Sequence, residues 1–360
     1  MSAEIGRRVA SLLPEGRTQR EIALEVGMTP DAFSRALNGQ RGFAAVELAR
    51  LADLLDADLH LLITGEPDPN RVVAAARHTY DHDTKRHHLP GVDQDRPQLE
   101  SVLLAYEQVH GALAPSAIPS SLAEARTALG EDFVLPFADR LDAIGIDVVR
   151  IRDLTSAYSL FIGQRAVIVL KATGNWFWEN WSLAHELAHV VERANAIRHG
   201  DAREHMPDER AANAFAAELL LPAARIETVD WATNSEADLA NRVWDLGVST
   251  EALSTRLASL GLPAAPHIAA WAAQPTQRLL RRHLVTLGDD DPITRRMDAA
   301  STRRFPLALQ DAHLREIARG TVRKDTLAWM LGVQAEALEV DEPASRNITS
   351  AGELAAILDL

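Results

Sequence analysis

The chain has 360 residues and a formal net charge of −14 at pH 7, a length that suits two or three hydrophobic cores. The acidic balance argues against nonspecific nucleic-acid binding by the whole chain, although a local basic face can still contact phosphates. There is no cysteine, which excludes disulfides, thiol catalysis and thiolate zinc sites, so any metal must be bound by histidine and carboxylate. No run approaches the roughly 18 apolar residues of a membrane span, and no secretory signal is recognisable, so we expect a cytoplasmic protein with no membrane contact.

Residues 1–66 are expected to form a first helical domain that ends in the turn-forming run TGEPDPN. Within it, TQREIALEVGMTPDAFSRALNGQR predicts two helices: Thr18 caps the first, Gly27 permits a tight turn, and Thr29 with Pro30 begins the second. This arrangement is typical of a helix-turn-helix domain. The apolar side chains expected between the two helices are Ala23, Val26, Phe33 and Leu37.

Residues 5–63 resemble the phage-repressor (XRE) class of DNA-binding domains. Asp31, Ser34 and Arg35 are expected to face outward on the second helix. The resemblance makes Arg35 and Asp31 candidates for reading bases, and the candidates for phosphate contacts are Gln19, Asn38 and Arg41. Residues 1–50 carry seven arginines against six acidic residues, which is weakly basic, so affinity for DNA would require a homodimer. The alternative is a helix-turn-helix used only for protein contact.

Residues 67–117 are expected to form a helical connector, with helices over Arg71–His78 and near Leu99–Leu113. A polar run lies between them. Four histidines of this region could form a second metal cluster, but no helical spacing links them all, so a solvated connector is favoured. These histidines are His78, His82, His87 and His88.

Residues 118–262 combine strand and helix patterns, which predicts an α+β domain. Two apolar, β-branched runs in DVVRIRDLTSAYSLFIGQRAVIVL indicate two or three strands. A long helix is expected from Asn180 to about Ala196, and a second, alanine-rich helix over Asp208–Leu221 is stopped by Pro222.

The motif HELAH in the first of these helices indicates a metal site. His185 and His189 are four residues apart, so on a helix they point at one spot and can bind one ion. Glu186 lies close enough to reach a water molecule at the metal without being a ligand, which is the general-base position for peptide hydrolysis. A chance string in an amphipathic helix is the alternative. It is disfavoured because a purely structural helix needs no polar strip among the apolar Leu183, Leu187 and Val190.

A catalytic zinc needs a third protein ligand, and Glu209 stands at the head of the second helix. Asn213, one turn later, can orient a ligand histidine. Glu218 falls on the opposite face and cannot share the ion, while Asp208 is a weaker rival to Glu209. The group that stabilises the oxyanion is left open among Tyr158, His199 and His205. The cluster of Trp176, Trp178 and Trp181 could line a substrate groove, but packing against the core is favoured.

These motifs resemble the ImmA/IrrE metallopeptidases in order and spacing across residues 118–262. The runs that carry the resemblance are GIDVVRI, AVIVL, SLAHELAHVVE, ERAANAFAAELLLP and LGVSTEALSTRLASLGL. The resemblance implies a zincin-like, thermolysin-like zinc site of His185, His189 and Glu209 with Glu186 catalytic, and limited cleavage of a repressor. The tryptophan-rich run NWFWENW and Lys171 depart from the family pattern in the region of the substrate groove.

Residues 263–360 are expected to form an all-helical C-terminal domain. Residues 275–325 hold eleven basic and seven acidic side chains, and this basic face is expected to be solvated, or to bind DNA or an acidic partner. The whole chain is therefore expected to be mainly α with a small β-sheet. Its expected function is that of a regulatory zinc peptidase that binds DNA and cuts a repressor or regulator. The alternative is a non-catalytic transcription regulator, or an antitoxin with a toxin partner, in which the zinc site is structural or vestigial.

Overall fold

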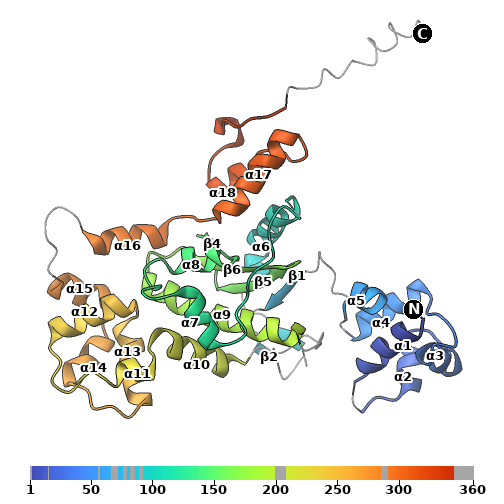
Figure 1. The fold of residues 1–360 in the computed structure, drawn as a ribbon, viewed down its shortest axis with the longest axis horizontal. Coiled ribbons are helices and arrows are strands. Elements are labelled where there is room, and N and C mark those ends of the chain that lie inside the picture. Colours follow the sequence, from blue (N-terminus) through green and yellow to red (C-terminus); the bar gives the residue numbers. More distant parts are fainter. Residues whose placement is uncertain are drawn as a thin grey trace, which may run out of the picture.

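The computed structural model describes residues 2–14, 16–55, 57–65, 92–109, 111–198, 208–284 and 291–343, together with the backbone of short strands at 72–75, 79–81 and 86–88. The chain is mainly helical with a small sheet (Figure 1), which confirms the expected composition of the fold. Within these described residues, no helix combines the length and the apolar character needed to cross a membrane. His78, His82, His199 and His205 lie outside the described residues, and His87 and His88 are described by backbone alone.

The N-terminal helices form a hydrophobic core of their own. Thr18 and Glu21 form a reciprocal capping box at the start of α2, and Thr29 caps α3 with Pro30 in its first turn, as predicted. Gly27 has a φ of +75°, the left-handed conformation that the tight turn requires. The helices are α1 (Ser2–Ser11), α2 (Gln19–Glu25), α3 (Pro30–Leu37), α4 (Ala45–Leu55) and α5 (Leu59–Thr64). The four apolar residues expected between α2 and α3 are all buried in this core.

The connector contains strands, so the expected helix over Arg71–His78 is wrong. Val72–Ala75 forms strand β1, which pairs antiparallel with a strand about 90 residues later in the chain. Tertiary pairing outweighs local preference in so short and β-branched a run, and the sequence does not reveal such a distant partner. The other elements of the connector are β2 (Thr79–Asp81), β3 (Arg86–His88) and α6 (Val92–Glu107). The last of these begins and ends earlier than the helix expected near Leu99–Leu113.

The main sheet has four strands in the order β1-β5-β6-β4. Its strands are β4 (Ile146–Ile151), β5 (Tyr158–Ile162) and β6 (Arg165–Lys171), in addition to β1. β5 is antiparallel to β1 and β6, whereas β4 is parallel to β6. β4, β5 and nearly all of β6 are buried, which explains their continuous apolar runs.

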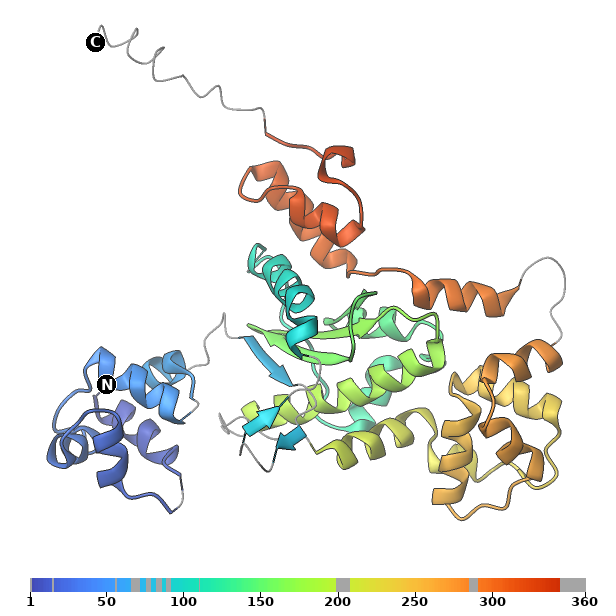
Figure 2. The ribbon, with the colours of Figure 1, turned by 180° about the vertical axis from the view of Figure 1, so that it is seen from behind.

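Two hydrophobic cores cover the two faces of this sheet. On β5, Phe161 belongs to the core that contains α9 (Trp176–Arg198), whereas Tyr158 and Leu160 belong to the opposite core with α6. Figure 1 and Figure 2 show α9 along one side of the sheet and α6, with α17 (Leu307–Arg319) and α18 (Asp325–Leu331), on the other. Successive side chains of a strand point to opposite faces, so β5 separates two environments.

The remaining helices complete both cores. Those on the α9 side are α7 (Leu122–Leu129), α8 (Phe137–Ala143), α10 (Glu209–Leu220), α11 (Ala223–Ile226), α12 (Glu236–Leu246), α13 (Thr250–Ser259), α14 (Pro266–Ala272), α15 (Thr276–His283) and α16 (Pro292–Ser301). A 3₁₀ turn, η1 (Ala335–Ala337), follows α18. Described residues beyond 262 thus contribute to the cores on both faces of the sheet. These residues form no additional hydrophobic core of their own.

Arg304 and Arg150 join the C-terminal region to the sheet. The backbones of Arg304 and Arg150 form a reciprocal antiparallel bridge at β4, with N···O distances of 2.9 and 3.0 Å. The buried guanidinium of Arg150 donates to the carbonyl oxygens of Ala299 and Thr302 and to the buried carboxylate of Glu179. Arg304 pairs with Asp139 and Asp142. Two of the arginines expected on a solvated or partner-binding basic face, Arg304 and the ring-stacked Arg296, are instead engaged within the chain.

Candidate metal centre

The HELAH motif lies in the middle of α9, against β5 and β6. Leu183, Leu187 and Val190 are fully buried in the core and fix the rotation of the helix. The helix therefore turns His185 and His189 toward α10, and both imidazoles are almost completely buried. Histidines buried at this depth need polar partners.

Glu209, in the first turn of α10, meets both histidines. Nε2 of His185 lies 3.1 Å from Nε2 of His189 and 3.3 Å from Oε2 of Glu209, and Glu209 Oε1 lies 3.6 Å from His189 Nε2. A tetrahedral zinc with bonds of about 2.0–2.2 Å requires neighbouring ligand atoms about 3.3–3.5 Å apart. The three side chains thus fit one ion, and they are a group of described residues able to hold a metal.

Two further side chains lie beside the imidazoles. Oδ1 of Asn213 lies 3.2 Å from Nδ1 of His185, so a proton on Nδ1 leaves the lone pair of Nε2 directed at the metal position. Nδ1 of His189 lies 3.8 Å from the carboxylate of Glu192. Asn213 therefore lies beside a ligand histidine, at the position expected from the sequence.

Glu186 follows His185 on α9 and is almost fully buried. Its carboxylate accepts a hydrogen bond of 2.9 Å from the hydroxyl of Ser159. Sequence reasoning missed Ser159, whose signal was a small polar residue among large apolar and aromatic ones in the strand. Ser159 therefore holds one carboxylate oxygen of Glu186 in place.

The carboxylates considered as rivals have other roles. Glu218, on the opposite face of α10, pairs with Arg126 and Arg256. Asp208 is the N-cap of α10 and accepts hydrogen bonds from the backbone of Arg210 and Ala211. Both placements agree with the helix geometry that favoured Glu209.

Tyr158 does not reach the metal centre. It follows the alternation of β5 to the opposite face of the sheet, where its hydroxyl donates to buried Asp95 over 2.5 Å. Burial beside this carboxylate raises the pKa of Tyr158 well above its ordinary value. Its candidacy as the oxyanion-stabilising group is therefore wrong.

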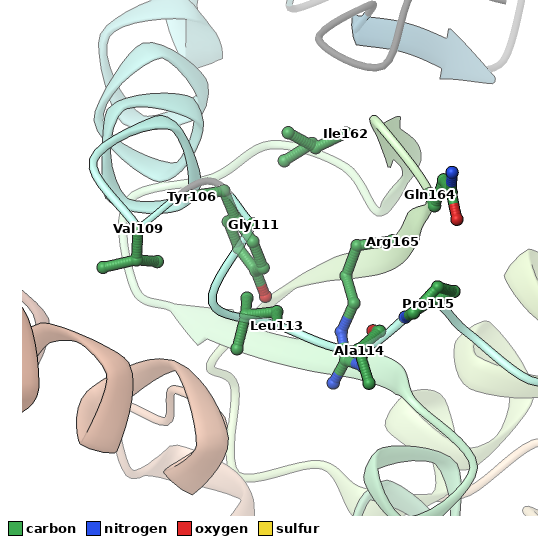
Figure 3. A pocket seen from close by; sticks show the side chains of 9 residues that line it. All are labelled: Tyr106, Val109, Gly111, Leu113, Ala114, Pro115, Ile162, Gln164 and Arg165. Atoms are coloured by element: carbon green, nitrogen blue, oxygen red, sulfur yellow. Dashed lines mark hydrogen bonds between the residues drawn. The ribbon is translucent and has the colours of Figure 1, made fainter.

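A small pocket of about 220 Å³ opens near the end of α6 and the turn between β5 and β6 (Figure 3). Tyr106 and Arg165, two of its lining residues, both hydrogen-bond the buried Asp147. None of the three metal-centre side chains lines this pocket. The hydrogen bonds of Tyr106 and Arg165 to Asp147 join α6 and β6 to β4.

The three tryptophans before the motif divide into two groups. Trp176 is buried against Phe177 and Trp244, so packing is confirmed for it. Trp178 and Trp181 are half-buried and line a cleft of about 760 Å³ between α9, α10 and α13. Trp181 also packs against the hydrophobic core, as expected, so its indole both packs and lines the cleft.

The candidate DNA-contacting residues lie on the N-terminal helices and in the turn after α3. The hydrophobic core of these helices is distinct from that of the metal centre. Gln19, Asp31 and Asn38 are exposed, and Ser34 is half-buried. The exposed Arg35 forms an ion pair with Asp31 at 3.2 Å. Arg41 is engaged by Glu47.

Two histidines four residues apart on one helix, an intervening glutamate and a glutamate from the next helix define a domain of metallopeptidase type. Residues 141–258 match the model of the M78 peptidase family, described as the IrrE N-terminal-like domain. The matched segment includes His185, Glu186, His189, Glu209 and Asn213. No curated protein and no solved structure matches the chain.

Proposed function

We propose that the chain is a zinc-dependent regulatory metallopeptidase, which makes a limited cut in a partner repressor or regulator and thereby alters transcription. The observation that carries this proposal is the convergence of His185, His189 and Glu209 beside Glu186, a carboxylate that is not one of the converging ligands. A site that only holds a metal for structure has no use for such a carboxylate.

The chemistry follows from the positions of these side chains. Zinc, when bound, acts as a Lewis acid toward the carbonyl group of a peptide bond. Glu186 takes the proton from the attacking water and delivers it to the leaving amine. Ser159 holds the carboxylate of Glu186 in place during this transfer, and Asn213 keeps His185 in the tautomer that can bind the ion.

We expect Glu186→Gln to abolish cleavage while the protein keeps its zinc and its fold, because the substitution removes only the proton acceptor. The source proteome is incubated with either protein, and sequencing of new N-termini compares them. Wild type should produce one or a few new termini, and the variant none. Identical termini with both proteins would show that Glu186 is not the base, and general digestion would contradict a regulatory role.

We further propose that the N-terminal helices bring the peptidase to DNA, with α3 reading bases. The capped α2 and α3, joined by a turn at Gly27, and the exposed Arg35 support this role. Arg35 would exchange its ion pair with Asp31 for a base edge. Because this domain is only weakly basic, we expect the chain to bind DNA as a homodimer.

Arg35→Ala should weaken binding to the preferred duplex by about 1–3 kcal/mol and relax its sequence preference. Asn38→Ala should instead weaken binding to all sequences alike, because a phosphate contact carries no base information. Selection from a random duplex library, followed by titration with the selected and a scrambled duplex, measures both effects. Equal affinity of wild type for the two duplexes would mean that the domain does not read bases.

A further inference from the structure

The cleft of about 760 Å³ beside the metal centre is formed by three helices. Trp178 and Trp181 come from α9, Asn213 and Ala217 from α10, and Ala252 and Thr255 from α13. Asn213 also contacts His185, so one residue belongs both to the cleft and to the support of the metal centre. The cleft therefore lies next to the position of the peptide bond that the metal centre would cleave.

Helix geometry aligns the cleft with the ligands. On α9, Trp178, Trp181 and His185 follow one another at steps of three and four residues, so they share one face. On α10, Glu209, Asn213 and Ala217 follow one another at steps of four residues and also share one face. Each face runs from the metal centre into the cleft, and at a rise of 1.5 Å per residue the indoles lie about 6–10 Å along α9 from His185.

The walls of the cleft suit a large apolar side chain. α9 contributes two indole rings to its lining, and α10 contributes the small Ala214 and Ala217, which leave room for an occupant. The wall has two charged residues: Glu251, which is exposed, and Arg256, which is held by Glu218 and by the carbonyl oxygen of Leu221. A flat aromatic group can stack on indole surfaces, whereas an anionic group would have to compete with Glu218 for Arg256.

We propose that this cleft is a side-chain subsite of the metal centre and that it binds one large apolar, preferably aromatic, side chain of the protein substrate. Because an extended chain advances about 3.3 Å per residue, the occupant lies within about three residues of the bond at the metal. Trp178 and Trp181 are the residues that set this preference. The inference rests on the proposed function, since it names a substrate feature for the same centre.

Two succinic hydroxamates that differ only in a benzyl or a methyl side chain test the subsite, because the hydroxamate binds the zinc in both. Calorimetric titration of the zinc-loaded full chain should give at least about tenfold tighter binding for the benzyl compound, as expected when an aromatic ring is buried. Trp181→Ala should bring this ratio close to one while the affinity for the methyl compound stays unchanged.

A second variant and a control keep the test decisive. Ala217→Trp should also abolish the preference by filling the cleft from α10, and circular dichroism establishes that both variants fold. Trp329→Ala, which removes a half-buried indole from α18, should leave the ratio unchanged. Equal affinity of wild type for both compounds would overturn the subsite and leave the metal centre intact. If neither compound binds, the proposed function itself fails.

Discussion

Glu209→Gln should lower the affinity for zinc by more than about 100-fold, the upper end of the effect of losing an outer partner of a metal ligand. The carboxylate approaches both imidazoles, at 3.3 and 3.6 Å, and a neutral amide oxygen is a poorer ligand for a dication. His185→Ala combined with His189→Ala should remove the metal altogether. Competition with a chelator of known affinity, combined with elemental analysis, measures both losses.

Glu218→Gln is the matched control, since it makes the same chemical change on the opposite face of α10. It should leave the zinc affinity unchanged, because Glu218 is engaged by Arg126 and Arg256 and not by the histidines. An empty site in Glu218→Gln with a full site in Glu209→Gln would contradict the assignment of the third ligand. Equal zinc content of wild type and the double histidine variant would end the zinc hypothesis.

Arg150→Met should lower the free energy of unfolding by about 3–5 kcal/mol at pH 7, because it leaves the buried carboxylate of Glu179 without its partner. Burial already raises the pKa of Glu179, and Arg150 opposes this effect. Without Arg150 the folded protein should hold a proton on Glu179. The variant therefore loses stability as the pH rises above the ordinary pKa of 4.5. Urea denaturation at pH 5 and pH 7 measures this difference.

Two comparisons separate the buried charge from a general loss of packing. Arg150→Met with Glu179→Leu should recover most of the lost stability, since no buried charge then lacks a partner. Arg96→Met breaks the exposed pair with Asp93 and should cost at most about 1 kcal/mol. A loss in Arg150→Met that is independent of pH would contradict a role for the charge of Glu179.

The sequence predicted the features that depend on local spacing. The caps Thr18 and Thr29 and the paired histidines are fixed by positions within one helix or at its start. Glu209 and Asn213 lie on the next helix, and the family resemblance supported the prediction that Glu209 completes the site. Helical periodicity is a property of neighbouring residues, so these positions can be read without knowledge of the rest of the fold.

The features that were missed depend on contacts between distant segments. β1 became a strand because β5 offers it backbone partners, and Ser159 was placed beside Glu186 only by the packing of β5 on α9. The cleft at Trp178 and Trp181 exists only because α13 forms one of its walls. No local pattern reveals that an indole near the core also lines a cleft.

Segments outside residues 118–262 also pair with the main sheet at both of its edges. β1 pairs with β5, and the backbone of Arg304 pairs with β4. A fragment limited to residues 118–262 would lose both partners and expose unpaired backbone N–H and C=O groups on two apolar strands. Open strands of this kind recruit other chains and promote aggregation. The connector and the C-terminal region thus protect both edges of the sheet from pairing with other chains.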